Sequence, residues 1–196
     1  MYTIPYKIEH TLHIKNSRFI ACLFPVHSKL DIQKAIAECK QKYPDATHYC
    51  YAYVLEEKET QAKDDHEPSG TAGIPILTVL ESQEWNDVLC VVVRYFGGIK
   101  LGAKGLVRAY RKSATEVLKK APRMRQSQGF QIEITISYDR QKQVDLLLKN
   151  DQVVARSFQE IVKIIANVSL ETIEQLKEHQ IPFEIIQAIK IEKEFL

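Results

Sequence analysis

Apolar and polar positions alternate in short runs through the first half of the chain, a pattern typical of strands interspersed with helices. Residues 8–14 and 18–24 are rich in apolar side chains and flank Asn16-Ser17, which predicts a hairpin with its turn at those two residues. Residues 56–70 are polar, show no periodicity and end in Pro-Ser-Gly, so we expect a long surface loop. The other elements expected up to residue 96 are a helix after Ser28, a strand over 48–55, a short helix over 75–82 and a buried strand over 87–96.

The clearest helix follows the glycine-containing segment at 97–105. Apolar residues recur there at spacings of three and four, which defines one core-facing stripe. The members of that stripe are Val107, Tyr110, Ala114, Val117 and Ala121. Ala121-Pro122 is expected to end the helix, and the polar, basic segment 122–129 is expected to be a linker.

The last third of the chain has a simple order of elements. Strand-like and helical patterns follow one another at 130–138, 139–149, 152–158, 160–168, 169–179 and 183–192. This β-α-β-β-α-β order is that of a ferredoxin-like domain. A length of 196 residues accommodates two domains of ordinary size. We therefore predict an α+β protein with an N-terminal α/β domain at 1–124 and a C-terminal ferredoxin-like domain at 125–196.

Charge is distributed unevenly along a chain whose net charge is only +2. Residues 94–125 carry ten basic residues and a single acid, Glu116, whereas the segments on either side are net acidic. At about 100° per residue, five cations fall on one sector of the predicted helix, beside its apolar stripe. These cations are Lys104, Arg108, Arg111, Lys112 and Lys119. Arg94 and Lys100 are expected to extend this basic patch.

A turn rich in glycine precedes the same helix. Its glycines are Gly97, Gly98, Gly102 and Gly105. Backbone N–H groups at a helix N-terminus, with cations nearby, form a natural anion site. Glycine in such a turn also serves positive φ angles without any ligand. The segment lacks the GxxxxGK[ST] pattern, so it is not a P-loop.

The basic helix face has three possible explanations. It contacts phosphate or nucleic acid, it contacts an acidic protein surface, or it only keeps the helix soluble. A solubilising face normally mixes both signs of charge, and this one does not. We therefore favour an anionic partner, with RNA or the ribosome first and an acidic protein as the alternative.

A polar cluster at 64–69 is the candidate for enzymatic chemistry. Asp64, Asp65, His66 and Glu67 offer oxygen ligands and one imidazole for a metal ion, and Ser69 follows two residues later. Consecutive residues of one loop rarely converge on one ion, and EPSGTAG is not a G-x-S-x-G nucleophile elbow. A hydrolase or a phosphate-handling enzyme using this loop is the alternative to our prediction of a protein with no catalytic residue, metal or cofactor. The acidic loop and the basic block at 94–98 are also expected to meet at one edge of the sheet.

Cellular location follows from what the sequence lacks. No apolar run approaches the roughly 20 residues that span a bilayer, and the N-terminal residues do not resemble a signal peptide. The four cysteines are scattered without a CxxC pair, which favours reduced thiols packed as small hydrophobic side chains. We expect a cytoplasmic protein that binds no membrane. Its oligomeric state is left open.

Three sequence blocks occur in an order and spacing that resemble the IMPACT/YigZ family. They are HYCYAY, DDHEPSGTAGIPIL and VVVRYFGGIKLGAKGLVRAY. The second block contains the family-motif residues Asp64, Asp65, Glu67, Ser69, Gly70 and Thr71. The resemblance covers the N-terminal domain, and the tail resembles the bacterial branch of the family and the last domain of elongation factor G. It implies a two-layer α/β fold like the second domain of a small-subunit ribosomal protein.

The resemblance also implies an association with translation. Eukaryotic relatives restrain a starvation-sensing kinase by competing for its ribosome-associated activator, through an additional domain that this chain lacks. We therefore expect a non-catalytic RNA- or ribosome-associated binding protein, without that specific activity. Two residues depart from the family pattern, because His66 and Lys104 each replace a glycine. The histidine suggests that the backbone at residue 66 does not require a positive φ angle.

Overall fold

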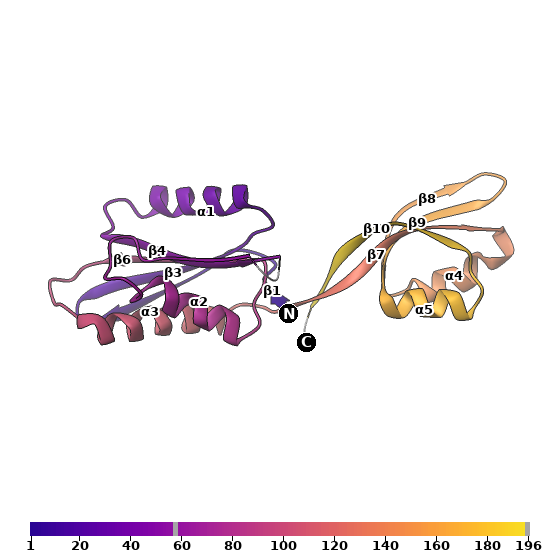
Figure 1. Cartoon of the computed structure of the whole chain (residues 1–196). Helices are drawn as coiled ribbons and strands as arrows, with labels where there is room; N and C mark the ends of the chain where they lie inside the picture. The colour runs from indigo at the N-terminus through magenta and orange to yellow at the C-terminus, as the bar shows by residue number, and fades with distance from the viewer. Residues whose placement is uncertain (57–58, 195–196) are drawn as a thin grey trace. The chain divides into compact units, whose positions relative to one another are not determined.

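The computed structural model describes residues 1–56 and 59–194, which form two compact units (Figure 1). The first unit contains Met1–Met124 together with Glu194, and the second contains Arg125–Lys193. In chain order, the elements of the first unit are β1 (Tyr2–Thr3), β2 (Ile8–Ile14), β3 (Ser17–Pro25), α1 (Lys29–Lys42), β4 (His48–Leu55), β5 (Glu59–Lys63), α2 (Gly73–Ser82), β6 (Val88–Tyr95) and α3 (Gly102–Leu118).

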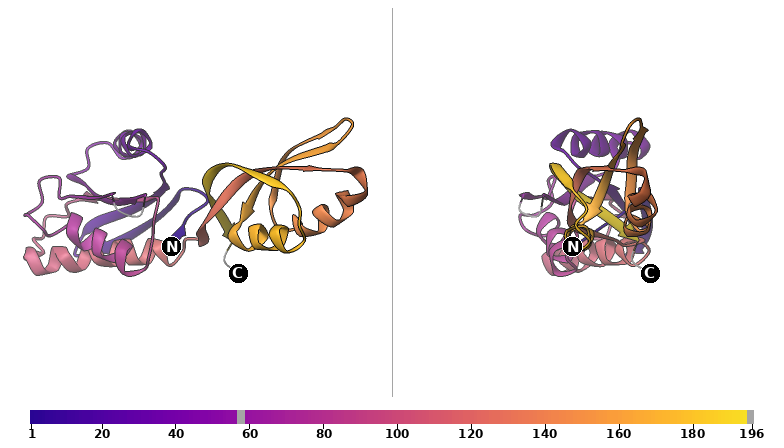
Figure 2. Two further views of the ribbon diagram at one scale, coloured as in Figure 1. Left: turned by 45° about the vertical axis from the view of Figure 1, so that its right-hand side comes forward. Right: turned by 90° about the vertical axis from the view of Figure 1, so that its right-hand side faces the viewer.

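The first unit is built on an antiparallel sheet in the order β2-β3-β6-β4-β5. β6 lies at its centre, and all but the last of its residues are buried because helices cover both faces. Figures 1 and 2 show α1 on one face and α2 with α3 on the other. Two separate hydrophobic cores result, one against α2 and α3 and one against α1. The first core encloses Trp85, the only tryptophan of the chain.

The hairpin between β2 and β3 has its turn one residue earlier than predicted. Ile14 pairs with Ser17, so the two turn residues are Lys15 and Asn16. Both have positive φ angles, of 45° and 63°. This backbone twist matches the twist of the paired strands, and asparagine adopts it readily. Ser17 is therefore the first residue of β3 and is fully buried.

The prediction of one long loop over residues 56–70 is wrong for its middle part. Glu59–Lys63 forms β5, the edge strand that pairs with β4, and residues 57–58 lie outside the described part of the chain. No side chain of this edge strand is fully buried, so burial does not impose an apolar alternation on it. The polar sequence ETQAK therefore gave no strand signal.

Helix α3 buries a broader stripe than the one predicted. Tyr110, Ala114 and Val117 are buried as expected, but Val107 is only half buried. The helix ends at Leu118, three residues before Ala121. The buried face also includes Leu106, Ala109, Ser113 and Leu118, which complete the contact with the sheet and α2.

The second unit has the ferredoxin-like order of elements. They are β7 (Met124–Ile136), the 3₁₀ turn η1 (Tyr138–Arg140), α4 (Gln141–Leu147), β8 (Gln152–Phe158), β9 (Val162–Ser169), α5 (Leu170–Glu178) and β10 (Phe183–Glu194). The strands lie in the order β10-β7-β9-β8, with both helices on one face (Figure 1). Ser169 caps α5 by accepting a hydrogen bond from the backbone N–H of Thr172. The predicted α+β class, with an α/β unit followed by a ferredoxin-like unit, is confirmed.

The segment predicted as a linker over 122–129 is mostly strand. β7 begins at Met124, six residues before the strand expected at 130. Its first half is polar and half exposed, so the hydrophobic alternation that predicts a strand begins only at Phe130.

All four cysteines are free thiols buried in the first unit: Cys22, Cys39, Cys50 and Cys90. Burial raises the pKa of the Cys90 thiol well above its ordinary value, so this group stays protonated at neutral pH. No helix in the described residues has the length and apolar character needed to cross a membrane.

Candidate anion-binding surface and pocket

The basic face of α3 is exposed, as the helical spacing predicts. We define it by its exposed cations, which are Lys104, Arg108, Arg111, Lys112 and Lys119. Among the described residues, Lys119 is the one member that forms an ion pair, with Glu116 at 2.9 Å, and Lys112 lies near the same carboxylate. Within the described residues the other four cations form no ion pair. Lys104, Arg108 and Arg111 are therefore not paired with an acid in the described part of the chain.

Two shallow grooves run beside these cations. One, of about 530 Å³, is lined by Lys104, Arg108 and Lys112 together with Lys15 from the β2–β3 turn. The other, of about 340 Å³, lies between Lys104, Arg108 and Arg111. Lys15 was missed in the sequence because no periodicity links a hairpin turn to a helix 90 residues later. The antiparallel sheet brings the turn to the start of α3.

The glycine turn before α3 has two distinct structural roles. A side chain at Gly97 would overlap the backbone of Asn16 and Ser17, so this glycine allows the hairpin turn to approach closely. Gly98 and Gly102 have φ angles of +82° and +70° with open space around them. A Cβ atom at Gly105 would meet the Leu101 side chain at 3.0 Å. The helix start has no side-chain cap and no acid in its first turn, which leaves backbone N–H groups there for other partners.

Arg94 does not extend the exposed patch, contrary to the expectation. Its side chain is only 5% exposed and forms an ion pair with Glu67, which is 4% exposed. The guanidinium also lies against the rings of Phe19 and Phe96, at 5.3 and 5.4 Å from their centroids. Burial of a cation on the central strand requires such a partner. The acidic loop and the basic block therefore meet at one end of the sheet, as predicted.

Glu67 is the centre of a small buried polar network. Its Oε1 accepts hydrogen bonds from Arg94 and from the hydroxyl of Tyr110, at 2.7 Å for the latter, and lies 3.7 Å from His48 Nε2. Burial, together with the neighbouring Cys50 and Glu67, raises the pKa of the Tyr110 phenol well above its usual range. The tyrosine therefore stays a hydrogen-bond donor to the carboxylate at all physiological pH values.

The remaining motif residues of the loop hold its backbone in place. Asp64 accepts hydrogen bonds from the N–H groups of Gly70, Ala72 and Gly73, all within 2.9 Å. Asp65 accepts from the N–H of Tyr49, which ties the loop to β4. Thr71 is buried and donates to the carbonyl of Pro68. Ser69 is exposed, and in the described residues no base lies within hydrogen-bond distance of it.

The positive φ angle of His66 corrects one inference from the sequence. The backbone there has φ = 67°, and Asp65 before it has φ = 41°. The position thus does adopt the left-handed conformation that glycine favours, and histidine adopts it at a cost. In the described residues no group of three or more His, Cys, Asp or Glu side chains is arranged to hold a metal ion.

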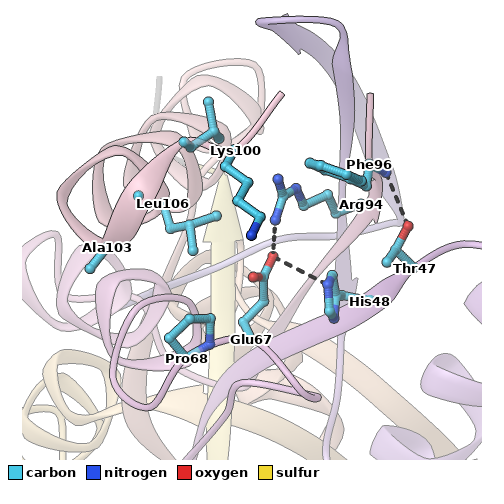
Figure 3. Close-up of a pocket in the computed structure, with 11 residues that line it drawn as sticks. Thr47, His48, Glu67, Pro68, Arg94, Phe96, Lys100, Ala103 and Leu106 are labelled. Carbon is cyan, nitrogen blue, oxygen red and sulfur yellow. Dashed lines mark hydrogen bonds and ion pairs between the residues drawn. The ribbon is translucent and has the colours of Figure 1, made fainter. Parts of the chain in front are cut away.

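A pocket of about 400 Å³ opens where β6, the acidic loop and α3 meet (Figure 3). Its lining includes the polar groups of Thr47, His48, Glu67, Arg94 and Lys100. The rest of the lining is apolar or glycine: Pro68, Phe96, Leu101, Gly102, Ala103 and Leu106. Of the predicted residues, the structure therefore brings Glu67, Arg94, Lys100 and Gly102 together here. It leaves Asp64, Asp65 and Ser69 outside.

The role assigned to Asp64 predicts a stability change that depends on pH. Burial opposes its ionisation, but the three backbone hydrogen bonds outweigh this and hold the pKa below its usual value. The stabilisation is therefore complete above the unfolded-state pKa of about 3.9 and is lost as pH falls through the folded-state pKa. We expect Asp64→Asn to cost about 1–2 kcal/mol of unfolding free energy at pH 7, with a smaller difference at pH 3.

Urea denaturation followed by the fluorescence of Trp85 measures this difference in the first unit alone. Asp45→Asn, at an exposed site, is the matched control and should leave the midpoint unchanged. Equal midpoints for wild type and Asp64→Asn at pH 7 would show that the carboxylate does not hold the loop.

Comparison with known proteins gives consistent results. A family model described as the Impact N-terminal domain matches residues 15–118. The "IMPACT family member YvyE" of Bacillus subtilis (strain 168) is 48% identical over 119 residues, which span 60% of this chain and only 55% of that relative. An "IMPACT family member" of Haemophilus influenzae is 35% identical over 167 residues, or 82% of this chain and 81% of the relative. A crystal structure described as that of an hypothetical protein covers 95% of this chain and 97% of its own, with 25% identity and a TM-score of 0.64.

Proposed function

This chain belongs to the IMPACT family, and we propose that it is a non-catalytic binding protein that contacts structured RNA through the basic face of α3. Ribosomal RNA in the cytoplasm is the partner that fits best with the translation-linked role implied by the family resemblance. The RNA contact itself is inferred without reference to the activity of any relative. It rests on the surface of this chain.

The observation that carries the proposal is the unpaired state of four exposed cations. Within the described residues, Lys104, Arg108, Arg111 and Lys112 form no ion pair, although acids make up 25 residues of the chain. Most of those acids lie outside the segment that forms α3. A nucleic acid releases the counterions condensed on its phosphate groups when such cations bind there. This release drives binding without base contacts.

The grooves beside α3 favour a polyanion as the binding partner. Both grooves contain Lys104 and Arg108, and the first is extended by Lys15 from another part of the fold. Cations from two separate elements thus line one continuous surface. A phosphodiester backbone presents evenly spaced charges to such a surface, whereas plain solvation of a helix requires no arrangement of this kind.

Binding to RNA should fall steeply as salt rises. If the basic face contacts about four to six phosphates, the logarithm of affinity should fall with the logarithm of salt concentration at a slope of roughly −3 to −5. Arg108→Glu combined with Arg111→Glu should lower affinity for a structured RNA by about 30-fold or more and reduce the slope by about 2. Fluorescence anisotropy at several salt concentrations measures both quantities.

The matched control carries the same change of charge in the second unit. Lys142→Glu combined with Lys149→Glu alters two exposed cations outside the basic face and should retain binding. The thermal midpoint of the α3 variant should equal that of the wild type, because both arginines are exposed. An equal loss of RNA affinity in the two double variants, or RNA binding that is independent of salt concentration, would contradict the proposal.

Cell lysate provides a second test, which separates RNA from an acidic protein partner. In a sucrose gradient the wild-type protein should sediment with ribosomal particles and return to the top after nuclease treatment. Co-sedimentation that nuclease does not release would favour the acidic protein partner.

A further inference from the structure

The pocket in front of Arg94 has apolar walls of the size and shape that suit a flat ring. Its volume of about 400 Å³ lies within the range of small-ligand sites. Phe96, the residue after β6, forms one wall and is 44% exposed. Pro68, Leu101 and Leu106 form the other walls. An exposed aromatic face next to aliphatic walls is a stacking platform for a base.

The floor of this pocket offers one hydrogen-bond acceptor beside several donors. The hydrogen bonds to the Glu67 carboxylate fall on Oε1, so its second oxygen takes none from the described residues. Figure 3 shows the amine of Lys100 pointing toward Glu67 and Arg94. A ligand that fits must therefore donate to a carboxylate and accept from cations at the same time.

The pocket shares lining residues with both grooves of the basic face. Leu101 lines both the pocket and the larger groove, and Ala103 lines both the pocket and the smaller groove. A chain of phosphates that follows the cations of α3 therefore passes the mouth of the pocket. A nucleotide that is not base-paired is able to turn its base inward there.

We propose that the pocket receives the base of one unpaired nucleotide, with guanine preferred, while the basic face holds the neighbouring phosphates. The guanine N1–H and N2–H groups lie on one edge of the base, so both are able to donate to the second oxygen of Glu67, and O6 and N7 accept from a cation. Uracil has a single ring N–H between two carbonyl groups, and those carbonyls face the carboxylate unfavourably. This inference rests on the proposed RNA binding and adds a base preference to it.

Two short oligonucleotides of equal charge test the preference. We expect a uridine heptamer with one central guanosine to bind about tenfold more tightly than the all-uridine heptamer, as one bidentate base contact would give. Ala103→Trp fills the pocket from an exposed position without changing charge. It should reduce the preference to less than about twofold. Thr115→Trp, on the same helix and outside the pocket, is the matched control and should keep the preference.

Mononucleotides test the pocket even if no RNA polymer binds. Guanosine 5′-monophosphate should shift the amide NMR signals of residues 100–106 in the wild type and not in Ala103→Trp. Uridine 5′-monophosphate and inorganic phosphate should shift them far less.

Equal affinity for the two heptamers, together with equal shifts from guanosine monophosphate and phosphate, would overturn the base pocket and leave the RNA proposal standing. Loss of heptamer binding with intact shifts from guanosine monophosphate would instead overturn only the RNA proposal.

Discussion

Replacing Glu67 by alanine is expected to lower the free energy of unfolding of the first unit by about 3–5 kcal/mol, because it leaves the buried Arg94 without a counter-ion. The hydroxyl of Tyr110 loses its acceptor in the same change. Since Trp85 is the only tryptophan and lies in the core of this unit, its fluorescence in urea reports this unit separately from the second.

Two further variants test whether the unpaired charge of Arg94 causes that loss of unfolding free energy. Glu67→Leu combined with Arg94→Met removes both charges and should recover much of the stability, since a buried ion pair contributes little beyond its own desolvation cost. Glu116→Ala removes an acid from an exposed pair with Lys119 and should leave the urea midpoint unchanged. A Glu67→Ala midpoint equal to that of the wild type would mean that Arg94 finds another partner or leaves the core.

Replacing Gly97 by alanine should have the next largest effect. The added methyl group overlaps the backbone of Asn16 and Ser17, and backbone atoms do not move aside as a flexible side chain does. We expect a cost of about 3 kcal/mol, measured again by urea denaturation, because the hairpin must shift or the strand end must separate from it. The same shift displaces Lys15 from the groove beside α3, so RNA affinity should fall as well.

The variant Gly98→Ala distinguishes the cost of the steric overlap at Gly97 from the cost of backbone strain. Gly98 has a positive φ of 82° but open space around it, so alanine there meets strain without a clash. That strain costs about 1–2 kcal/mol. A larger cost for Gly98→Ala than for Gly97→Ala would show that the close approach of the hairpin turn is not required.

Most of the fold was predictable because its elements carry strong local patterns. β4 and β8 have the predicted bounds, and Ser28 and Ser169 are the N-caps of α1 and α5. The segments that sequence patterns missed are those where pairing, not side-chain burial, makes the strand. Residues 59–63 pair only at a sheet edge, and the first half of β7 is polar.

The candidate site was predictable only in part. The exposed cations follow from helical spacing, which is a local property. The burial of Arg94 does not follow from helical spacing, because it depends on an ion pair with Glu67, 27 residues earlier in the sequence. Glu67 belongs to a segment whose sequence predicts a solvated loop. The place of Lys15 beside α3 could not be predicted either, because it also depends on a contact between segments far apart in the sequence. The fold assembles the pocket from three segments, and no single segment shows it.

The burial of every cysteine has a practical consequence for mapping the partner. None of the four thiols is exposed, and burial raises the pKa of Cys50 as well as that of Cys90, so few thiolates are available to react. The thiols of the native chain are therefore expected to react little with maleimides. A cysteine introduced at exposed Lys119 would be the single reactive site, and a photo-crosslinker attached there would join the protein covalently to whatever lies against α3 in the cell.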